Sequence, residues 1–314
     1  MYAIQACNLC GSADAQPFAT GRDRMHNQPG TFAFVRCTHC GLIYLNPRPD
    51  PVELARYYPD EYESYRESPD EQGSQLRRLD LRRGIQNQCQ PVLALTGGRP
   101  GRILDVGCAT GGFLAGMREH GWEVAGIETS PFAAHYARTA LGLDVHEGML
   151  EAAALPGRHF DVVTLWHVFE HVDDPKATLL EANRLLKPGG WLVLTVPHME
   201  SPEARLFGRY WLGLDIPRHL HLFTKPVLRR YLEETGFDYV RDACITGRSV
   251  GATMSIGFWA TDWRVPDSVR RAILAAVNSL PVRIVLWPYY WLLGRLGQGS
   301  FVTVFARKME RRQQ

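Results

Sequence analysis

The sequence predicts an α/β protein in which a small cysteine-rich module precedes a doubly wound sheet of seven strands. Residues 102–114 read RILDVGCATGGFL, an apolar run that ends near Asp105, turns through glycines and continues as a helix. From Gly101 onward, apolar runs alternate with helical segments, which is typical of a doubly wound sheet. Two Cys-x-x-Cys-Gly sequences stand within the first 41 residues, so a separate module is expected before the sheet.

The composition is that of a globular protein without a basic excess. The chain has 314 residues, 45% of them hydrophobic, which is ample for a core. A net charge of +2 gives no support to a nucleic-acid partner. The N-terminal residues MYAIQACNLC have neither a basic start nor an apolar run, so we expect no secretory signal and a cytoplasmic location.

Four of the seven cysteines form two close pairs that predict a metal site. They lie in Cys7-Asn-Leu-Cys10-Gly11 and Cys37-Thr-His-Cys40-Gly41. Each pair can offer two thiolates to one tetrahedral ion, and the glycine that follows permits the tight turn. Four thiolates close the site, so we predict a structural Zn²⁺ and expect His39 to be a bystander. Residues 1–48 are therefore interpreted as a zinc ribbon, with short strands at TFAFVRC and LIYLNP.

A proline-rich break at 46–51 ends this module, and residues 49–98 are predicted to be a helical linker.

The glycine-rich turn that follows the first strand of the main domain predicts a nucleotide-cofactor site. Gly107, Gly111 and Gly112 let a ligand approach the bare backbone. The spacing also matches a degenerate dinucleotide fingerprint, but Asp105 would repel a pyrophosphate. A carboxylate suits a ligand with an ammonium and a sulfonium, so the predicted cofactor is S-adenosylmethionine.

The later strands are expected at 122–127, 143–146, 160–166, 191–196, 239–245 and 301–306. Glu128 ends the second strand, about twenty residues beyond the glycines, where it can accept the cofactor's ribose hydroxyls. Ser130-Pro131 and Pro175 begin helices. Lys187-Pro-Gly-Gly190 is predicted to turn the chain before the fifth strand.

These motifs resemble the class I S-adenosylmethionine-dependent methyltransferases over about residues 100–197. Motif I, Asp-x-Gly-x-Gly-x-Gly, corresponds to Asp105, Gly107, Ala109 and Gly111, with alanine as the departure. The resemblance implies a Rossmann-like sheet whose last strand inserts antiparallel between the fifth and sixth, in a domain at 99–309. It implies these cofactor-binding residues: Asp105, Gly107, Cys108, Ala109, Gly111, Phe113, Glu128, Thr129, Met149, Leu150 and Trp166. Tyr57, Tyr58, Tyr62 and Tyr65 precede motif I and either cover the cofactor or pack the ribbon on the domain.

Catalytic candidates follow the fourth and fifth strands. Methyl transfer needs alignment of donor and acceptor and one base, so His167, Glu170, His171 and His219 are candidates. Glu170 and His171 equally fit a helix start held by local hydrogen bonds. The segment 197–224 is interpreted as too polar and broken for a core and is predicted to cap the substrate through Trp211, Arg218 and His221. Arg218 offers a forked donor for a carboxylate or phosphate.

A second insertion, residues 248–298, combines apolar runs with tryptophans and arginines. Asn278, Pro281 and Pro288 interrupt it, so a transmembrane helix is not expected. Peripheral contact with a membrane at its inner face, a homodimer interface and a hydrophobic lid all fit.

The sequence as a whole predicts methyl transfer to a small-molecule acceptor, most simply O-methylation of a sugar, a lipid-linked intermediate or a polar metabolite. Alternatives are a protein or RNA methyltransferase recruited by the ribbon, a C-methyltransferase of a nucleotide-linked sugar, and a non-catalytic cofactor-binding scaffold.

Overall fold

The computed structural model describes residues 1–58, 75–245 and 250–310 of the chain. The chain forms two compact units, each assembled from separate stretches of sequence. One comprises Met1–Tyr57, Val196–Leu228 and Asp242–Thr303, and the other comprises Tyr58–Thr195, Arg229–Arg241 and Val304–Gln314. We call them the ribbon unit and the sheet unit and describe each by itself. The three-part division expected from the sequence stays a prediction.

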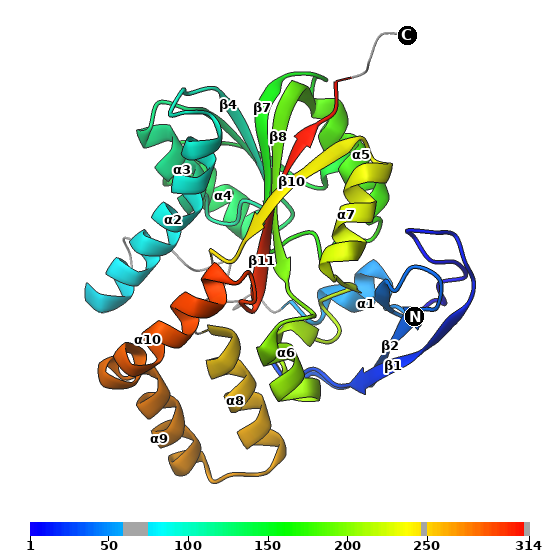
Figure 1. Cartoon of the computed structure of the whole chain (residues 1–314), viewed down its shortest axis with the longest axis vertical. Helices are drawn as coiled ribbons and strands as arrows, with labels where there is room; N and C mark the ends of the chain where they lie inside the picture. Colours follow the sequence, from blue (N-terminus) through cyan, green and yellow to red (C-terminus); the bar gives the residue numbers. More distant parts are fainter. Residues whose placement is uncertain (59–74, 246–249, 311–314) are drawn as a thin grey trace. The chain divides into compact units, whose positions relative to one another are not determined.

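The sheet unit is built on a seven-stranded sheet in the order β10-β11-β8-β7-β4-β5-β6. β4 pairs in parallel with both β5 and β7. At the opposite side of the sheet, Met309 N donates to Gly236 O, so the end of β11 meets the start of β10, and Figure 1 shows β11 running against its neighbours. The predicted doubly wound sheet is confirmed. The strands are β4 (Arg102–Val106), β5 (Glu123–Glu128), β6 (Asp144–Glu147), β7 (Phe160–Trp166), β8 (Leu186–Pro197), β10 (Phe237–Ala243) and β11 (Phe301–Lys308).

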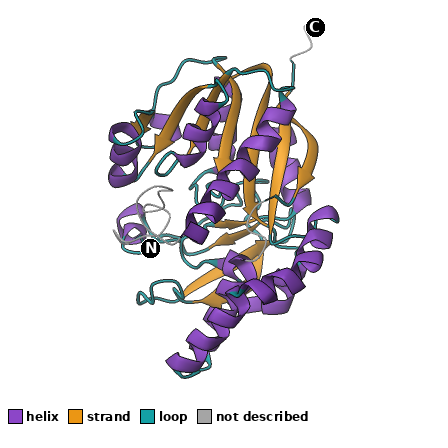
Figure 2. Cartoon of the chain, turned by 90° about the vertical axis from the view of Figure 1, so that its left-hand side faces the viewer, coloured by secondary structure: helices purple, strands orange, loops and turns teal. Residues whose placement is uncertain are grey.

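Helices lie on both faces of this sheet (Figure 2). Their starts are specified locally, as the sequence predicts. Ser130 caps α4 by accepting from Ala133 N, and Asp174 caps α5 by accepting from Ala177 N at 2.9 Å, each with proline at the first helical position. The helices are α2 (Gln75–Leu95), α3 (Gly112–Glu119), α4 (Pro131–Thr139), α5 (Pro175–Leu185) and α7 (Lys225–Glu234), with a 3₁₀ turn at Leu150–Ala152.

The predicted turn at Lys187–Gly190 is wrong in its placement, because these residues belong to β8. Leu186 pairs with Phe160, and the next pair is Trp191 with Val162, so β8 advances five residues while β7 advances two. The residues between them form an irregularity within the strand rather than a turn before it. Gly189, at φ +70°, supplies the left-handed backbone that this bulge requires.

The ribbon unit contains a four-stranded sheet in the order β1-β2-β3-β9. β1 (Ala15–Gly21), β2 (Phe32–Cys37) and β3 (Ile43–Leu45) form an antiparallel meander, of which the sequence predicted the last two. β9 (His221–Leu222) joins the edge of β3 from far along the chain. A short helix, α1 (Pro51–Ala55), follows with a capping box between Asp50 and Glu53.

The expectation that 197–224 is too polar for a core is wrong. This segment folds as α6 (Pro202–Phe207) and two 3₁₀ turns, Gly208–Tyr210 and Leu212–Leu214. Its apolar side chains are buried together with those of β2 and β3: Ala204, Trp211, Leu214, Ile216, Leu220 and Leu222 cluster with Phe32, Phe34, Ile43 and Leu45. The segment therefore supplies half of the core that the small ribbon sheet could not build alone.

The insertion that precedes β11 forms three helices of the ribbon unit. They are α8 (Val250–Asp262), α9 (Asp267–Asn278) and α10 (Leu280–Arg295). Figure 1 shows the chain reversing between α8 and α9, whereas α10 follows α9 after a bend. No single helix in the described part of the chain is long and apolar enough to cross a membrane. By length and composition alone, α9 and α10 pass the test as a pair bent by 59°.

Candidate cofactor site and metal centre

The glycine loop lies where the strand order of the sheet reverses. β4 has β5 on one side and β7 on the other, and ligands of open α/β sheets bind beyond the carboxyl ends of strands at such a point. Gly107 has φ +71°, and a Cβ there would lie 2.4 Å from Val168 Cγ2. The loop after β4 therefore touches the loop after β7, and only glycine fits between them.

The rest of the loop has the backbone geometry of a tight cradle before α3. Gly111, at φ +84°, is the N-cap of α3, and a Cβ there would lie 2.3 Å from Leu143 Cδ1. Ala109, where the motif departs from glycine, is held at φ 48°. Its backbone N–H donates to Glu128 Oε2 at 2.8 Å. This hydrogen bond helps to hold Ala109 in the left-handed backbone conformation that glycine would otherwise adopt at this position of the motif.

Asp105 is a buried carboxyl at the end of β4, with only 3% of its surface exposed. Burial is the main cause that raises its pKa to about 8; a hydrogen bond from Thr164 acts against this shift and the nearby Glu128 carboxylate adds to it. Thr164 Oγ1 lies 2.6 Å from Asp105 Oδ1. A cation placed against Asp105 would reverse this cost and favour the ionised form.

Glu128 is the second buried acid of the loop region. Its Oε2 accepts from Ala109 N and its Oε1 accepts from Ser130 N, both at 2.8 Å. These two bonds fix the carboxylate between the glycine loop and the start of α4. Thr129 Oγ1 also donates to Oε1, at 3.4 Å. Oε2 keeps a second lone pair that can accept a ribose hydroxyl.

The loop after β7 holds the histidine candidates of the sheet unit. His167 has φ 58°, an uncommon value for a residue with a side chain, and its N–H donates to Thr195 O. Its Nδ1 lies 3.8 Å from Oε1 of the buried Glu170. His171 Nδ1 lies 3.1 Å from the Tyr58 hydroxyl. Backbone strain of this kind is held in place by surrounding structure and is frequent at functional sites.

The remaining predicted cofactor residues differ in exposure. Cys108, Phe113, Leu150 and Trp166 are buried, and the rings of Phe113 and Trp166 meet edge to face at 5.4 Å. Trp166 Nε1 is buried without a hydrogen-bond partner among the described residues. Thr129 and Met149 are exposed. Tyr62 and Tyr65 lie outside the described residues.

These residues fit S-adenosylmethionine. Two buried acids, Asp105 and Glu128, flank a loop whose glycines leave no room for side chains. As hydrogen-bond acceptors, these acids suit an ammonium and a ribose and oppose a phosphate. Asp105 would face the cationic end and Glu128 the ribose hydroxyls. When bound, this cofactor supplies an activated methyl group on a sulfonium.

The four predicted cysteine ligands lie together at one end of the ribbon sheet. Their Sγ atoms are all within 4.8 Å of one another. Gly11 N donates to Cys7 O and Gly41 N to Cys37 O, and both glycines have φ near +75°, so the two knuckles share the turn that the sequence predicted. The His39 side chain is 64% exposed and lies outside the cluster. A set of four converging thiols is that of a closed, structural zinc site.

Arg218, a predicted substrate contact, lies in the interior of the ribbon unit. Its side chain is fully buried. It pairs with Asp215 at 2.6 Å and with Asp23 at 2.7 Å, and it donates to the backbone oxygen of Tyr57. The guanidinium therefore links β1's flanking loop to the 197–224 segment and has a structural role, because its donors serve the protein itself.

Trp211 and His221, predicted to contact substrate, are likewise core residues. Trp211 is 2% exposed and packs over Gly213, where a Cβ would collide with its ring. His221 lies on β9, with its Nε2 3.2 Å from Arg48 and its ring stacked on Phe223. His219, a catalytic candidate, is buried with Nδ1 2.8 Å from Gly213 O, and burial lowers its pKa.

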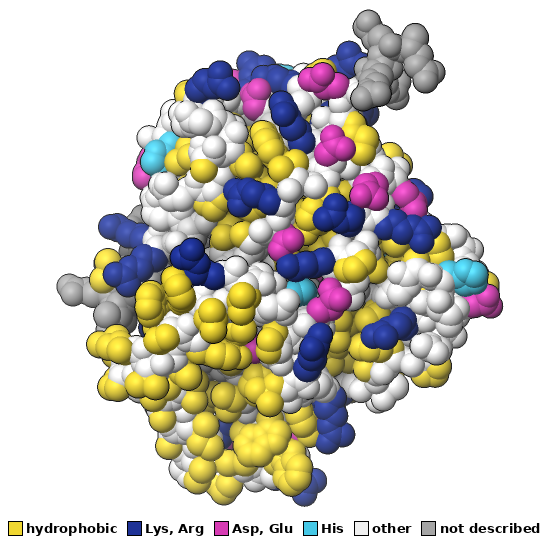
Figure 3. All heavy atoms as spheres, viewed as in Figure 1, with side chains coloured by type: hydrophobic (Ala, Val, Ile, Leu, Met, Phe, Trp, Pro, Cys, Tyr) yellow, Lys and Arg dark blue, Asp and Glu magenta, His cyan; other side chains and the backbone are white. Residues whose placement is uncertain are grey.

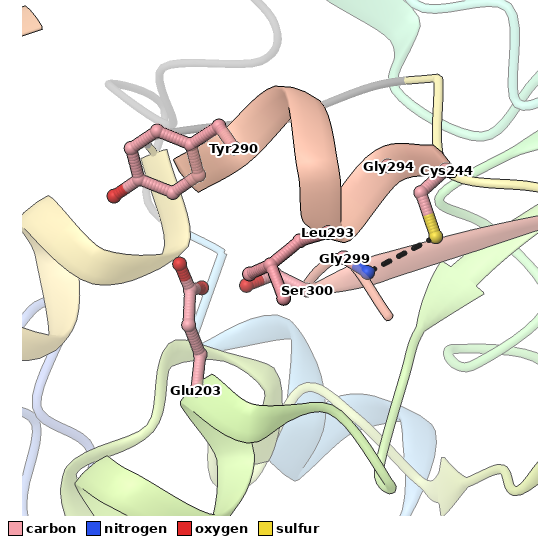
Figure 4. Close-up of a pocket in the computed structure, with 7 residues that line it drawn as sticks. All are labelled: Glu203, Cys244, Tyr290, Leu293, Gly294, Gly299 and Ser300. Atoms are coloured by element: carbon pink, nitrogen blue, oxygen red, sulfur yellow. Dashed lines mark hydrogen bonds between the residues drawn. The ribbon is translucent and has the colours of Figure 1, made fainter. Parts of the chain in front are cut away.

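The sequence analysis missed a buried carboxyl in the ribbon unit, Glu203 on α6. Figure 4 shows it pointing into a small cavity of about 10 Å³ beside Tyr290, Leu293 and Ser300. Glu203 Oε2 and Ser300 Oγ are buried with no hydrogen-bond partner among the described residues, and burial raises the pKa of Glu203 to about 7. A cavity of this size holds about one water molecule. Nothing in the local pattern PEARLF distinguishes this acid from a solvated one.

A seven-stranded sheet with one antiparallel strand, and a glycine loop between two buried acids, define a class I S-adenosylmethionine-dependent methyltransferase domain. A family model described as a methyltransferase domain matches residues 78–242, slightly more than half of the chain. The chain belongs to this methyltransferase family.

Curated relatives and solved structures agree with this membership. The chain is 34% identical to a ubiquinone biosynthesis O-methyltransferase of Nitrosospira multiformis, over 43% of this chain and 62% of the relative. It is 35% identical to the enzyme of the same name from an Azoarcus species, over 44% of this chain and 65% of the relative. The matches thus span less than two thirds of these relatives. A Burkholderia thailandensis 1,6-didemethyltoxoflavin-N1-methyltransferase shares the fold, with 18% identity, 89% of this chain and 96% of that chain covered, and a TM-score of 0.51.

Proposed function

We propose that this protein transfers the methyl group of S-adenosylmethionine to an oxygen atom of a small-molecule acceptor. The observation that carries the proposal is the pair of buried acids, Asp105 and Glu128, on either side of the glycine loop. The Glu128 carboxylate would repel the phosphates of a dinucleotide by direct Coulomb interaction, and a phosphate would oppose ionisation of Asp105, which a cation would favour. They suit a ligand whose two ends are an ammonium and a ribose.

The choice of oxygen as acceptor atom has support from the curated relatives. The Nitrosospira and Azoarcus relatives are named as O-methyltransferases, and they match this chain at 34–35% identity. The acceptor class remains the one that the sequence predicts: a sugar, a lipid-linked intermediate or a related polar metabolite. A hydroxyl acceptor must lose a proton during transfer, so the site requires a base.

His167 is the residue that we assign to this base. It follows β7 directly, beside the glycine loop that Val168 contacts. A neutral imidazole accepts a proton near pH 7, and the Glu170 carboxylate, 3.8 Å from Nδ1, would stabilise the imidazolium that results. The left-handed backbone at His167 fixes the direction of the ring relative to the strand end.

The cofactor part of the proposal is tested by titrating the purified full chain with S-adenosylhomocysteine in a calorimeter. We expect saturable binding with one site per chain. The absence of binding by the folded protein would refute the assignment of the loop.

The transfer itself is tested with a panel of acceptors, using formation of S-adenosylhomocysteine as the readout. The panel includes phenols, sugar nucleotides and polyprenyl-linked compounds, with ribosomal RNA and tRNA as macromolecular comparisons. His167→Gln should lower kcat by about 10²–10³-fold with cofactor affinity retained, in line with loss of a general base. Unchanged kcat in this variant would remove His167 as the base, and turnover on RNA alone would refute a small acceptor.

We infer in addition that the four-cysteine cluster holds one structural Zn²⁺. Its support is the convergence of four thiols from two glycine-ended knuckles. The metal content of the purified chain, measured by plasma mass spectrometry, should be one zinc per chain.

A further inference from the structure

Helices α8–α10 expose an unusual amount of apolar surface. The α8–α10 surface, as we call it, consists of the exposed apolar residues of these helices and their connections. Figure 3 shows hydrophobic side chains gathered over these helices. The exposed members are Val250, Trp259, Trp263, Val269, Leu280, Ile284, Val285, Trp287, Tyr289, Trp291, Leu292 and Leu296.

The polarity of α10 is the opposite of what a solvent-facing helix shows. Its partly buried side is formed by residues at helical spacing, such as Val282, Leu286 and Tyr290. Its outward side carries Val285, which is 75% exposed, and Trp287, which is 57% exposed. A surface helix of a soluble protein normally presents polar residues outward, so an apolar outward face indicates a partner.

The aromatic residues of this surface are those that favour a lipid–water boundary. Trp287 and Trp291 stack with ring centroids 6.3 Å apart, and Trp259 and Trp263 lie 6.2 Å apart. Arg295 lies over the Trp291 ring at 5.0 Å. Tryptophan places an apolar ring in the acyl region and its N–H at the headgroups, and arginine extends its charge to the same level.

The charge of the segment favours an anionic partner. Residues 250–298 contain five arginines and two aspartates, a net charge of +3. Both aspartates are already paired: Asp262 with arginines that flank β1, and Asp267 with Arg270 at 3.0 Å. Arg264, Arg271, Arg283 and Arg295 are exposed among the apolar residues.

A groove at the side of the surface adds an apolar recess. It has a volume of about 510 Å³ and is lined by α6 and α8 residues, including Leu206, Phe207, Ile256 and Trp259, with Arg209 and Tyr210. Leu206 is 75% exposed at this groove. An apolar recess with an arginine at its border suits an acyl chain below an anionic headgroup.

We propose that the α8–α10 surface docks on a lipid bilayer that contains anionic lipid, with α9 and α10 lying in the plane of the interface. Interfacial helices combine an apolar face, tryptophan and basic residues in this way. A second copy of the chain fits less well, because a twofold contact places the same patch on both sides and would oppose the exposed arginines without acids to match them. The bend of 59° between α9 and α10 also suits two short helices on a surface.

The proposal is tested by flotation of the full-length protein with vesicles in a density gradient. Vesicles of phosphatidylcholine with 30% phosphatidylglycerol are compared with vesicles of phosphatidylcholine alone, at 50 and 500 mM salt. We expect co-flotation with the anionic vesicles at low salt and loss of it at high salt. Brominated acyl chains in the same vesicles should quench tryptophan fluorescence.

Two variants separate the apolar and charged contributions. Val285→Glu with Trp287→Glu places charges on the exposed face of α10 and should abolish flotation. Arg271→Gln with Arg283→Gln should weaken binding to anionic vesicles about 30-fold, because each arginine near an anionic surface strengthens binding about 5-fold. Matched controls are Leu180→Glu, an exposed apolar residue of α5, and Arg99→Gln, an exposed arginine of the sheet unit.

Thermal melts of all four proteins establish that they remain folded. Three results would overturn the proposal: no flotation with either vesicle, equal flotation of the double glutamate variant, or a stable dimer in solution that the Val285 and Trp287 changes dissociate. The last result would identify a second copy as the occupant. Because no methyl transfer is measured, a failure here leaves the proposed function separately testable.

Discussion

Asp105→Asn is expected to stabilise the free protein and at the same time to weaken cofactor binding. The carboxyl is fully buried, and burial raises its pKa from 3.8 to about 8. A carboxyl whose pKa is raised on folding destabilises the protein increasingly as the pH rises from the unfolded value to the folded one. At pH 7 this cost is about 4 kcal/mol, about three pKa steps of 1.36 kcal/mol each.

Asparagine keeps the shape and the Thr164 contact but has no charge to desolvate. The variant should therefore melt several degrees higher than the wild type at pH 7. The difference should shrink towards pH 4, which is close to the unfolded pKa of 3.8, so that little of the cost of desolvating the charge remains. Melting followed by circular dichroism at pH 4, 5.5 and 7 measures this. Asp144→Asn, on an exposed aspartate at the start of β6, is the matched control.

Cofactor binding should change in the opposite direction. The ammonium group of S-adenosylhomocysteine, placed against Asp105, favours the carboxylate. Binding at pH 7 should therefore release about 0.9 proton from a group with a pKa near 8. Calorimetry in buffers of different ionisation enthalpy counts this proton, and it should be absent in the variant. Wild-type affinity in Asp105→Asn, or a lower melting temperature at pH 7, would refute the reasoning.

Three further outcomes follow from buried groups of the ribbon unit. Glu203→Gln should flatten the pH dependence of stability. In the wild type, a pKa raised from 4.5 to about 7 lowers the free energy of unfolding by about 3 kcal/mol as the pH rises between those values. A pH dependence that is unchanged in urea denaturation of the variant would contradict this. Arg218→Met should cost about 3–5 kcal/mol, since it leaves Asp23 and Asp215 buried without their counterion, and a loss below 1 kcal/mol in the same denaturation assay would count against the network. Cys37→Ser should reduce bound zinc to well below one equivalent, and full zinc occupancy by mass spectrometry would show that the cluster is not the site.

The elements of the sheet unit could be predicted because their signals are local. Ser130 and Asp174 cap helices through atoms three residues away, and Gly107 and Gly111 adopt the left-handed backbone that a tight turn requires. The acid at the end of each of the first two strands follows from strand length and loop spacing. The same locality explains the error at Lys187–Gly190, where a turn-like composition was accommodated as a bulge inside β8.

The sequence by itself determined the class of fold, the glycine loop with Asp105 and Glu128, and the two cysteine knuckles, because each depends on residues close together in the chain. Only the tertiary structure showed that the segment 197–224 is part of a buried core. Arg218 has Asp23 as its partner, 195 positions earlier, and β9 pairs with a strand that lies far before it in sequence. Whether a polar side chain such as that of Arg218 is solvated or buried depends on whether the fold brings a partner to it. A partner that is distant in sequence leaves no periodic pattern in the local sequence. Glu203 is also buried, and no local sequence pattern indicates this.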